Sequence, residues 1–347
     1  MYTQIYCARD PDFLARYCAQ PAMQRLASVG MHCGCEYSAL DVFRQVRGDY
    51  SRLTHSIGTA RIVWRFTASR AQTLAALFHD IATPCFAHVI DFMRGDHMRQ
   101  ESTEQGIREI LLGSSIGALL QRDAVRPEDV EDYHRYPIAD NDTPRLSADR
   151  LEYTLGNAYL VQREPLEAIR ALYGDLAVTT NESDLPELAF CSCEAAAQFT
   201  RIALRNARWF VSDEDRFLMQ YLADLVRLAL KRGTLTQPML WTDEPSVIRA
   251  LESDALLSPC WAAFRRIRSV RASAEPVDGY CVRIAAKKRW IDPLVCMRGG
   301  AQRISSLDAA VRDEIRAFLA ERFDRWIYAE EDGACLSFPQ SGASQGL

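Results

Sequence analysis

Ala75-Ala76-Leu77-Phe78-His79-Asp80-Ile81 ends an apolar helical run with an adjacent histidine and aspartate. Such a dyad is a poor choice for packing, because both side chains are polar, and a good choice for holding a metal ion. His55 precedes the dyad and Asp149 follows it, which gives two imidazoles and two carboxylates in the order H…HD…D. Four of the six histidines fall within residues 55–97, and this crowding indicates a metal site. Imidazole together with carboxylate suits Mn, Fe, Ni or Zn.

The composition is that of an ordinary globular protein. The chain has 347 residues, of which 48% are hydrophobic and 25% are charged, so it can bury a large core in one or two domains. Its formal net charge of −5 argues against nucleic acid and anionic membrane as partners. The sequence contains no apolar run of about 18 residues, so no membrane span is predicted. Eleven cysteines and an N-terminus unlike a secretory signal predict a cytoplasmic protein whose thiols are mostly reduced.

Helical periodicity dominates the chain, and the predicted fold class is all-α with a short β-hairpin in the C-terminal half. Ser51 is expected to cap the helix that carries His55, and Pro84 ends the helix of the dyad. Alternating apolar residues from Tyr280 to Ile284, followed by Lys287-Lys288-Arg289 as a turn, predict the hairpin over 279–295. Helices are expected at about 51–66, 70–80, 100–112, 147–160, 195–208, 213–231 and 306–326.

Four regions follow from this pattern. Residues 1–45 are expected to form a helical segment that packs on a metal-binding core over 46–164. Residues 165–340 are expected to form a C-terminal helical region that contains the hairpin. The polar, glycine-containing stretch 341–347 is predicted to be a disordered tail.

Five short motifs occur in a fixed order along the first half of the chain. They are Met23-Gln24-Arg25-Leu26, Arg52-Leu53-Thr54-His55-Ser56-Ile57-Gly58, Leu77-Phe78-His79-Asp80-Ile81, Phe86-Ala87-His88-Val89-Ile90-Asp91 and Asp149-Arg150-Leu151-Glu152-Tyr153. Together they resemble the HD-domain superfamily of metal-dependent phosphohydrolases, in particular its deoxynucleoside triphosphate triphosphohydrolase branch. The resemblance covers about residues 21–160, and it implies a helical HD-domain fold and a homo-oligomer.

The resemblance also implies roles for individual residues. The implied metal ligands are His55, His79, Asp80 and Asp149. The implied substrate-binding residues are Arg52, Arg150, Tyr153 and Asn157, and guanidinium groups match phosphate oxygens well. A divalent transition metal (Mn, Fe, Ni or Zn) would polarise a phosphoryl oxygen and lower the pKa of a bound water. Mg is a further candidate, as an ion that accompanies the substrate.

Two positions depart from the triphosphohydrolase branch. Thr83 and Thr103 stand where that branch has histidines, and a threonine cannot transfer protons near neutral pH as a histidine can. The candidate catalytic acid–base residues are therefore His88, Asp91 and Glu104. His88 is either a ligand of a second metal or a hydrogen-bonded support of the first site.

These observations predict a metal-dependent phosphohydrolase that acts on a nucleotide or related phosphate ester through a metal-activated water. The alternative is a nucleotide sensor or regulatory module that binds metal and nucleotide without turnover, which the two missing histidines favour. Lys287-Lys288-Arg289 is either a solvated turn or a phosphate site. Cys33-x-Cys35 and Cys191-x-Cys193 are either reduced thiols or a four-thiolate zinc site. His32 and His97 are expected to be surface or structural residues.

Overall fold

The computed structural model describes residues 2–7, 9–98, 106–331 and 333–339. Helices account for 54% and strands for 10% of the chain, which confirms the mainly helical class predicted from the sequence. The predicted tail 341–347 lies outside the described residues. Within the described ranges, no helix is both long enough and apolar enough to cross a membrane.

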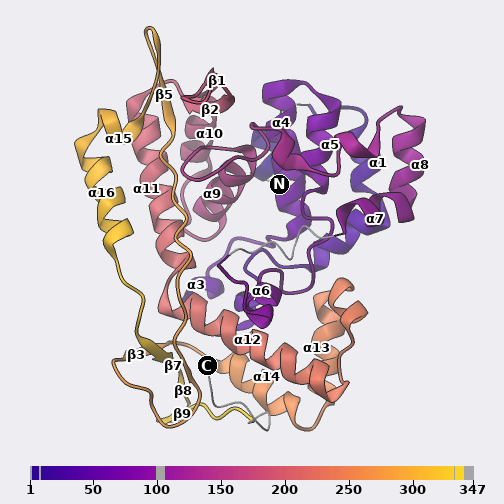
Figure 1. Cartoon of the computed structure of the whole chain (residues 1–347), viewed down its shortest axis with the longest axis vertical. Coiled ribbons are helices and arrows are strands. Elements are labelled where there is room, and N and C mark those ends of the chain that lie inside the picture. The colour runs from indigo at the N-terminus through magenta and orange to yellow at the C-terminus, as the bar shows by residue number, and fades with distance from the viewer. Residues whose placement is uncertain (1, 8, 99–105, 332, 340–347) are drawn as a thin grey trace.

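The described α-helices are named in chain order (Figure 1). They are α1 (Leu14–Cys18), α2 (Pro21–Gln24), α3 (Asp41–Arg44), α4 (Arg52–Thr67), α5 (Arg70–Phe78), α6 (Val89–Arg94), α7 (Ile107–Gly113), α8 (Ser115–Arg122), α9 (Ala148–Leu160), α10 (Leu166–Gly174), α11 (Cys193–Phe210), α12 (Asp213–Arg232), α13 (Glu244–Ser253), α14 (Leu257–Arg266), α15 (Ile304–Leu307) and α16 (Ala309–Ala320).

Most of the predicted helices are confirmed. Those expected at 51–66, 70–80, 147–160, 195–208 and 213–231 correspond to α4, α5, α9, α11 and α12. The Ser51 hydroxyl caps α4 by accepting a hydrogen bond from the backbone N–H of Thr54, as expected. The helix expected at 306–326 is too long, because α16 ends at Ala320. The helix expected at 100–112 is present as α7 from Ile107, and residues 99–105 lie outside the described part.

Helix α4 lies at the centre of the half that carries the metal-binding motifs. It packs against α5 and α9, and these three helices lie side by side in Figure 1. Because α4 carries His55, α5 ends directly before His79, and α9 carries Asp149, their packing brings three distant segments together. The apolar side chains that hold them share one core cluster, which includes Ala60, Ile62, Val63, Leu74, Leu77, Leu151 and Leu155.

A second core cluster forms around α12 in the lower half of Figure 1. Helix α12 packs against α6 and α14 there, and its buried residues include Phe217, Leu222 and Val226. Side chains from both core clusters border one cavity, which therefore lies between the two clusters.

Three small sheets complete the described fold. The first has the strand order β1 (Leu176–Thr180), β2 (Pro186–Phe190), β5 (Leu294–Met297) and β6 (Gly300–Arg303). The second has the order β3 (Arg271–Ser273), β7 (Trp326–Tyr328) and β4 (Cys281–Val282), and the third pairs β8 (Glu330–Glu331) with β9 (Ala334–Cys335). Most neighbours are antiparallel, whereas β2 and β5 run parallel. The region 165–340 is thus less purely helical than predicted.

The hairpin predicted over 279–295 is wrong. Strand β4 pairs with β7, whereas β5 belongs to another sheet, so the two predicted arms do not pair with each other. The alternation at 280–284 marks a real strand, but its partner is more than 40 residues away, beyond the reach of a local pattern. A hairpin does form just after this stretch, between β5 and β6, where Gly299 in the turn and Gly300 at the start of β6 both have positive φ.

Candidate metal centre

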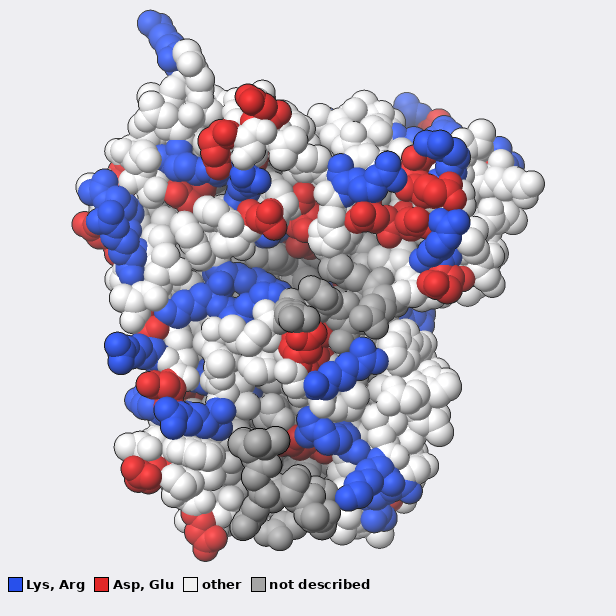
Figure 2. Space-filling view, viewed as in Figure 1, with Lys and Arg blue, Asp and Glu red and all other residues white. Residues whose placement is uncertain are grey.

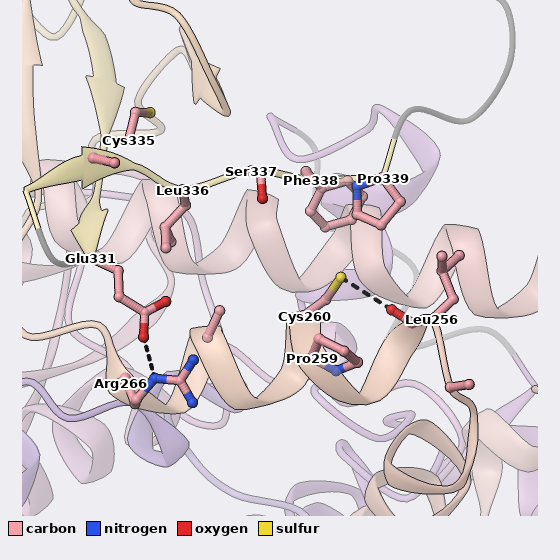
Figure 3. Close-up of a pocket in the computed structure, with 13 residues that line it drawn as sticks. Leu256, Pro259, Cys260, Arg266, Glu331, Cys335, Leu336, Ser337, Phe338 and Pro339 are labelled. Carbon is pink, nitrogen blue, oxygen red and sulfur yellow. Dashed lines mark hydrogen bonds and ion pairs between the residues drawn. The ribbon is translucent and has the colours of Figure 1, made fainter.

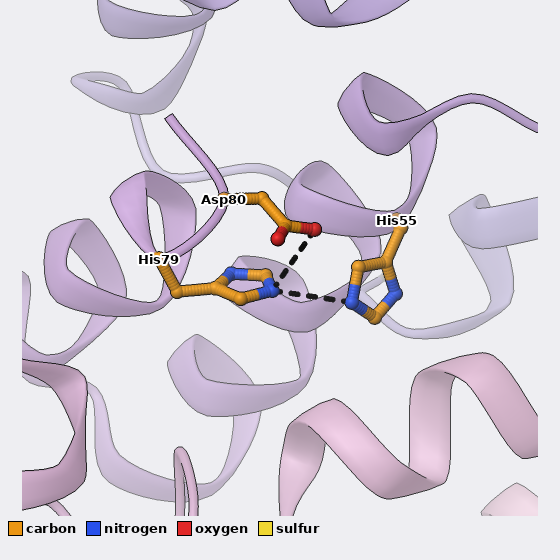
Figure 4. Close-up of side chains that lie close together, drawn as sticks. All are labelled: His55, His79 and Asp80. Carbon is orange, nitrogen blue, oxygen red and sulfur yellow. Dashed lines mark hydrogen bonds and ion pairs between the residues drawn. The ribbon is translucent and has the colours of Figure 1, made fainter. Parts of the chain in front are cut away.

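Four side chains converge at the predicted metal site. The Nε2 atoms of His55 and His79 lie 3.2 Å apart, and Asp80 Oδ2 lies 3.4 Å from His79 Nε2. One donor atom from each of these three buried residues lies within 4.8 Å of the others (Figure 4). Asp149 Oδ1 lies 2.9 Å from His55 Nε2 and 3.7 Å from His79 Nε2. The predicted ligand set is therefore assembled in space, with Asp149 the most exposed member.

The two histidines are oriented by contacts on their outer nitrogens. His79 Nδ1 lies 2.7 Å from the carbonyl oxygen of Ala76, which can only accept a hydrogen bond, so Nδ1 carries the proton. His55 Nδ1 lies 2.5 Å from Glu152 Oε2. Each ring therefore directs its Nε2 toward the site, an arrangement that also fixes the tautomer of metal-ligating histidines.

Asp80 is held by two neighbours on its outer side. Arg52 Nη1 donates to Asp80 Oδ2 at 3.1 Å, and the Thr83 hydroxyl donates to Oδ1 at 2.8 Å. Burial alone would raise the pKa of this carboxyl, but the charges of Arg52 and the two histidines and the Thr83 hydrogen bond hold it well below its usual range. Thr83 thus supports the candidate ligand Asp80, at the position where the resemblance leads one to expect a proton-transferring histidine.

The charge of His55 is set by its two carboxylate neighbours. Burial lowers the pKa of this imidazole, but hydrogen bonds and charges from Asp149 and Glu152 outweigh it and raise the pKa to about 10. His55 is thus protonated at neutral pH and bridges the two carboxylates. The same contact keeps the pKa of Asp149 below its usual value, although burial opposes this.

These residues fit a divalent metal. Two imidazoles, which ligate metals in their neutral form, and two carboxylates make a donor set that suits metals such as Mn, Fe, Ni or Zn. Their donor atoms already lie close to one another. Among the described residues, no other group of three or more His, Cys, Asp or Glu side chains is close enough for a metal ion. The cysteine pairs therefore form no zinc site: Cys33 and Cys35 are buried, whereas Cys191 and Cys193 are exposed.

The metal residues open onto a cavity of about 800 Å³. Every predicted metal ligand and every predicted substrate-binding residue lines it. Other residues of its wall come from distant parts of the chain, and they include His32, His88, His97, Tyr133, Trp209, Phe210, Asp215 and 285–289.

The predicted catalytic residues are placed differently from one another. His88 lines the cavity, and its Nδ1 lies 3.0 Å from Asp91 Oδ2. Asp91 is completely buried and does not line the cavity, and its contact with His88 connects it to the cavity wall. Burial lowers the pKa of His88, and the charge of Arg52 acts in the same direction. Glu104, like Thr103, lies outside the described residues.

The predicted substrate-binding residues already have protein partners. Arg150 Nη1 donates to Asn141 Oδ1 at 2.9 Å and to the carbonyl of Arg145 at 2.8 Å. Asn157 Nδ2 donates to the carbonyl of Tyr153 at 2.9 Å, while its Oδ1 lies 2.9 Å from His32 Nε2. The Arg52 Nε atom is different, because it is buried without a hydrogen-bond partner in the described part of the chain.

Three features of the site were not predicted. Glu152 contacts His55, although its position three residues after Asp149 on one helix was a usable signal. His32 was expected to be a surface or structural residue, and its place in the cavity wall, where burial lowers its pKa to about 4, was not predicted. The segment 285–289 lines the same cavity instead of forming a solvated hairpin turn, and no local pattern predicts this.

A second cavity, of about 680 Å³, lies between α14 and the last described residues (Figure 3). It contains the ion pair between Arg266 and Glu331 and a contact from Cys260 Sγ to the Leu256 carbonyl. None of the predicted site residues lines it. The chemistry predicted from the sequence therefore belongs to the larger cavity.

Comparisons with known proteins point in the same direction. No protein-family model matches the chain. It is 24% identical over 267 residues to the uncharacterized protein YdhJ of Bacillus subtilis, covering 76% of this chain and 79% of that one. It is 22% identical over 286 residues to the metal-dependent phosphohydrolase cns2 of Cordyceps militaris, covering 81% and 79%.

Solved structures share the fold. A phosphohydrolase from Bacteroides thetaiotaomicron superposes with a TM-score of 0.62 at 14% identity, covering 92% of this chain and 96% of that one. A hypothetical protein from Aquifex aeolicus gives 0.62 at 15% identity, covering 92% and 93%. The chain thus has a distant relative among metal-dependent phosphohydrolases and a buried His/His/Asp group with which to hold a metal.

Proposed function

We propose that this protein is a metal-dependent phosphohydrolase that acts on a nucleotide or a related phosphate ester. The observation that carries the proposal is the convergence of His55, His79, Asp80 and Asp149 at one wall of the large cavity. The distant relationship to the phosphohydrolase cns2 supports it.

A metal bound by this set would polarise a phosphoryl oxygen and supply a water of lowered pKa. Arg52 is suited to stabilise the phosphoryl group, because its guanidinium lines the cavity beside the candidate ligand Asp80. Arg150 lines the same cavity, and the Asn141 and Arg145 oxygens fix its guanidinium there.

His88 is the residue proposed to move a proton. It lines the cavity, its lowered pKa favours the neutral form near pH 7, and Asp91 orients the ring through Nδ1. A neutral imidazole can accept a proton from water, or return one to the leaving oxygen after protonation. Asp91 is then a positioning residue rather than a catalytic one.

Aromatic side chains favour a nucleotide as the substrate. Tyr133, Tyr153, Trp209 and Phe210 all line the cavity, and the rings of Tyr153 and Phe210 are 6.1 Å apart. Flat aromatic faces suit a nucleobase, which stacks favourably on them.

The experiment is phosphate, pyrophosphate and triphosphate release across a panel of nucleotides and simple phosphate esters. Wild type is expected to release product, and Asp80→Ala to release none. Asp41→Ala is the matched control, because Asp41 is an exposed carboxylate on α3, away from the cavity. Equal rates of product release by wild type and Asp80→Ala would exclude a phosphohydrolase that works at this metal site.

A nucleotide sensor without turnover is the second candidate. The hydrogen bond from the Thr83 hydroxyl to Asp80 favours the sensor, because position 83 then supplies no group that transfers a proton. Calorimetry separates the two candidates: tight nucleotide binding with no product supports the sensor, and metal-stimulated release of product excludes it.

A further inference from the structure

The chain between the His79-Asp80 dyad and α6 has strained backbone directly before His88. Phe86 and Ala87 have φ values of 61° and 44°, in the left-handed region that residues other than glycine rarely adopt. Such a conformation costs free energy and persists only where the surrounding contacts enforce it. His88 comes next as the N-cap of α6, so the turn at Phe86 and Ala87 determines where its imidazole enters the cavity wall.

A segment far away in the sequence holds the loop that contains this turn. The segment comprises residues 240–244, where a 3-10 helix ends and α13 begins. The backbone N–H of Cys85 donates to the Leu240 carbonyl at 2.7 Å. The Trp241 indole donates to the Ala82 carbonyl at 2.9 Å. The loop is therefore fixed at two points just before the left-handed turn.

Glu244 makes the contact within the turn itself. Its Oε1 accepts hydrogen bonds from the backbone N–H groups of Phe86 at 3.0 Å and Gly30 at 3.1 Å, and its Oε2 accepts one from the Tyr37 hydroxyl at 2.8 Å. Glu244 is only 1% exposed, so its carboxyl faces protein donors, unlike the Asp and Glu side chains that show at the surface in Figure 2. A glutamate is almost never buried in this way unless it is paired.

Aromatic packing holds the side chain of Phe86. The centroid of its ring lies 6.2 Å from that of Tyr37 and 6.4 Å from that of Trp261. A Cβ at Gly34 would lie 2.6 Å from Phe86 Cδ1, so the ring also packs closely on the backbone there. Phe86 is thus held at its side chain by packing and at its N–H by Glu244, which together enforce the left-handed conformation.

The same carboxylate oxygen reaches the helix of the candidate ligand His55. Gly30, which donates to Glu244 Oε1, forms a β-bridge with Ser51, and Ser51 caps α4. One buried oxygen atom therefore connects the turn before His88 to the start of the helix that carries His55. The relative positions of these two histidines depend on this connection.

We propose that Glu244 is a positioning residue of the site, which holds the left-handed turn at Phe86 and Ala87 and thereby places the His88 imidazole in the cavity wall. The role of His88 in moving a proton rests on the proposed function, whereas its placement by Glu244 does not. Residues 240–244 lie outside the five sequence motifs, so the proposal gives the C-terminal half of the chain a defined part in the site.

The test is NMR spectroscopy of histidine-labelled protein without added metal, in which the signals of His88 are identified by their loss in His88→Asn. Glu244→Ala removes the acceptor of the Phe86 N–H. The His88 ring signals are then expected to shift or broaden, and exchange of the Phe86 amide proton to become about tenfold faster or more, the factor that corresponds to one lost hydrogen bond. Glu244→Gln keeps an oxygen acceptor for the Phe86 and Gly30 N–H groups, so it should restore the wild-type signals.

Leu251→Ala is the matched structural control. Leu251 is buried about two helical turns beyond Glu244 on α13, and its truncation removes packing rather than a hydrogen bond to the loop. Its melting temperature should fall while its His88 signals stay at the wild-type positions. Circular dichroism verifies folding, and Glu244→Met, which keeps the bulk of the side chain without an oxygen, takes the place of Glu244→Ala if the alanine variant does not fold.

Three results would overturn the positioning role. They are wild-type His88 signals in the variant without an acceptor, equal disturbance of these signals in Leu251→Ala, and failure of Glu244→Gln to restore them. Failure of the proposed function looks different: wild type hydrolyses no phosphate ester, yet the His88 signals still depend on Glu244. Where product is released, Glu244→Ala should lower kcat with little change in KM, because His88 acts in proton transfer rather than in substrate binding.

Discussion

Glu152 Oε2 lies 2.5 Å from His55 Nδ1, and this contact determines which nitrogen of His55 faces the metal site. Both residues are almost completely buried. The Tyr50 hydroxyl donates to the same carboxylate oxygen at 2.7 Å, so Glu152 is itself held in place. A carboxylate behind a ligating histidine fixes the ring and increases its basicity.

Removing the charge of Glu152 is expected to weaken metal binding. Glu152→Gln keeps the size of the side chain but loses the ionic contact to His55, and changes of this kind typically cost about 10–100-fold in metal affinity. Competition titration with a metal indicator measures the affinity. Glu167→Gln, an exposed glutamate on α10, is the control and should leave it unchanged. Equal affinities for Glu152→Gln and wild type would show that Glu152 has no such role.

Gly58 leaves the space that Glu152 occupies. A Cβ at this position would lie 2.7 Å from Glu152 Cγ and Oε1, closer than real contacts allow. Glu152 cannot move away without releasing His55, so Gly58→Ala is expected to destabilise the protein by about 1–3 kcal/mol and to weaken metal binding as well. Chemical denaturation measures the first effect. Gly174→Ala is the control, because nothing lies within 4 Å of that position; a Gly58→Ala protein as stable as this control would contradict the packing described.

Metal affinity is expected to rise with pH. His55 has a raised pKa of about 10 and is protonated in the metal-free protein, so a metal ion must displace that proton. The apparent affinity should then increase about tenfold per pH unit from 6 to 8. The low pKa of Asp149 means that this carboxylate is already ionised and adds nothing to the slope. An affinity that is flat across this range would contradict the assignment of His55 as a ligand.

The stability of the fold is expected to fall as pH rises from about 4.5 to 7. Glu244 is buried, and its Oε1 accepts hydrogen bonds from the backbone N–H groups of Gly30 and Phe86. Burial and the charge of Glu36 raise its pKa from 4.5 to about 7. Between these values the folded protein holds a proton that the unfolded chain has lost, so stability is full below the window and decreases through it.

Melting temperatures across this pH window test the expectation. Glu244→Gln retains an oxygen that can accept from Gly30 and Phe86 but does not titrate, so its melting temperature should decline less than that of wild type. Parallel pH profiles for the two proteins would show that Glu244 does not contribute to the slope.

The convergence of the candidate ligands was predictable because each lies in a short motif on, or directly after, a helix whose periodicity is clear. His55, His79 and Asp149 come together when α4, α5 and α9 pack against one another. The apolar faces of these three helices dictate that packing. The contribution of 285–289 was not predictable, because it depends on anchors at Arg216 and at the end of α16 that are far away in sequence. The mistaken hairpin has the same cause, since β4 pairs with a distant strand.

Phosphate-ester hydrolysis by this protein is proposed to depend on a metal held by His55, His79, Asp80 and Asp149. The most direct measurement is the rate of phosphate release by the wild-type protein as purified, after treatment with a chelator, and after addition of Mn, Fe, Ni, Zn or Mg. Phosphate release by wild type is expected to stop on chelation and to return with at least one of these ions, whereas Asp80→Ala should show no release with any of them. Release that is unaffected by chelation and equal in Asp80→Ala would contradict it.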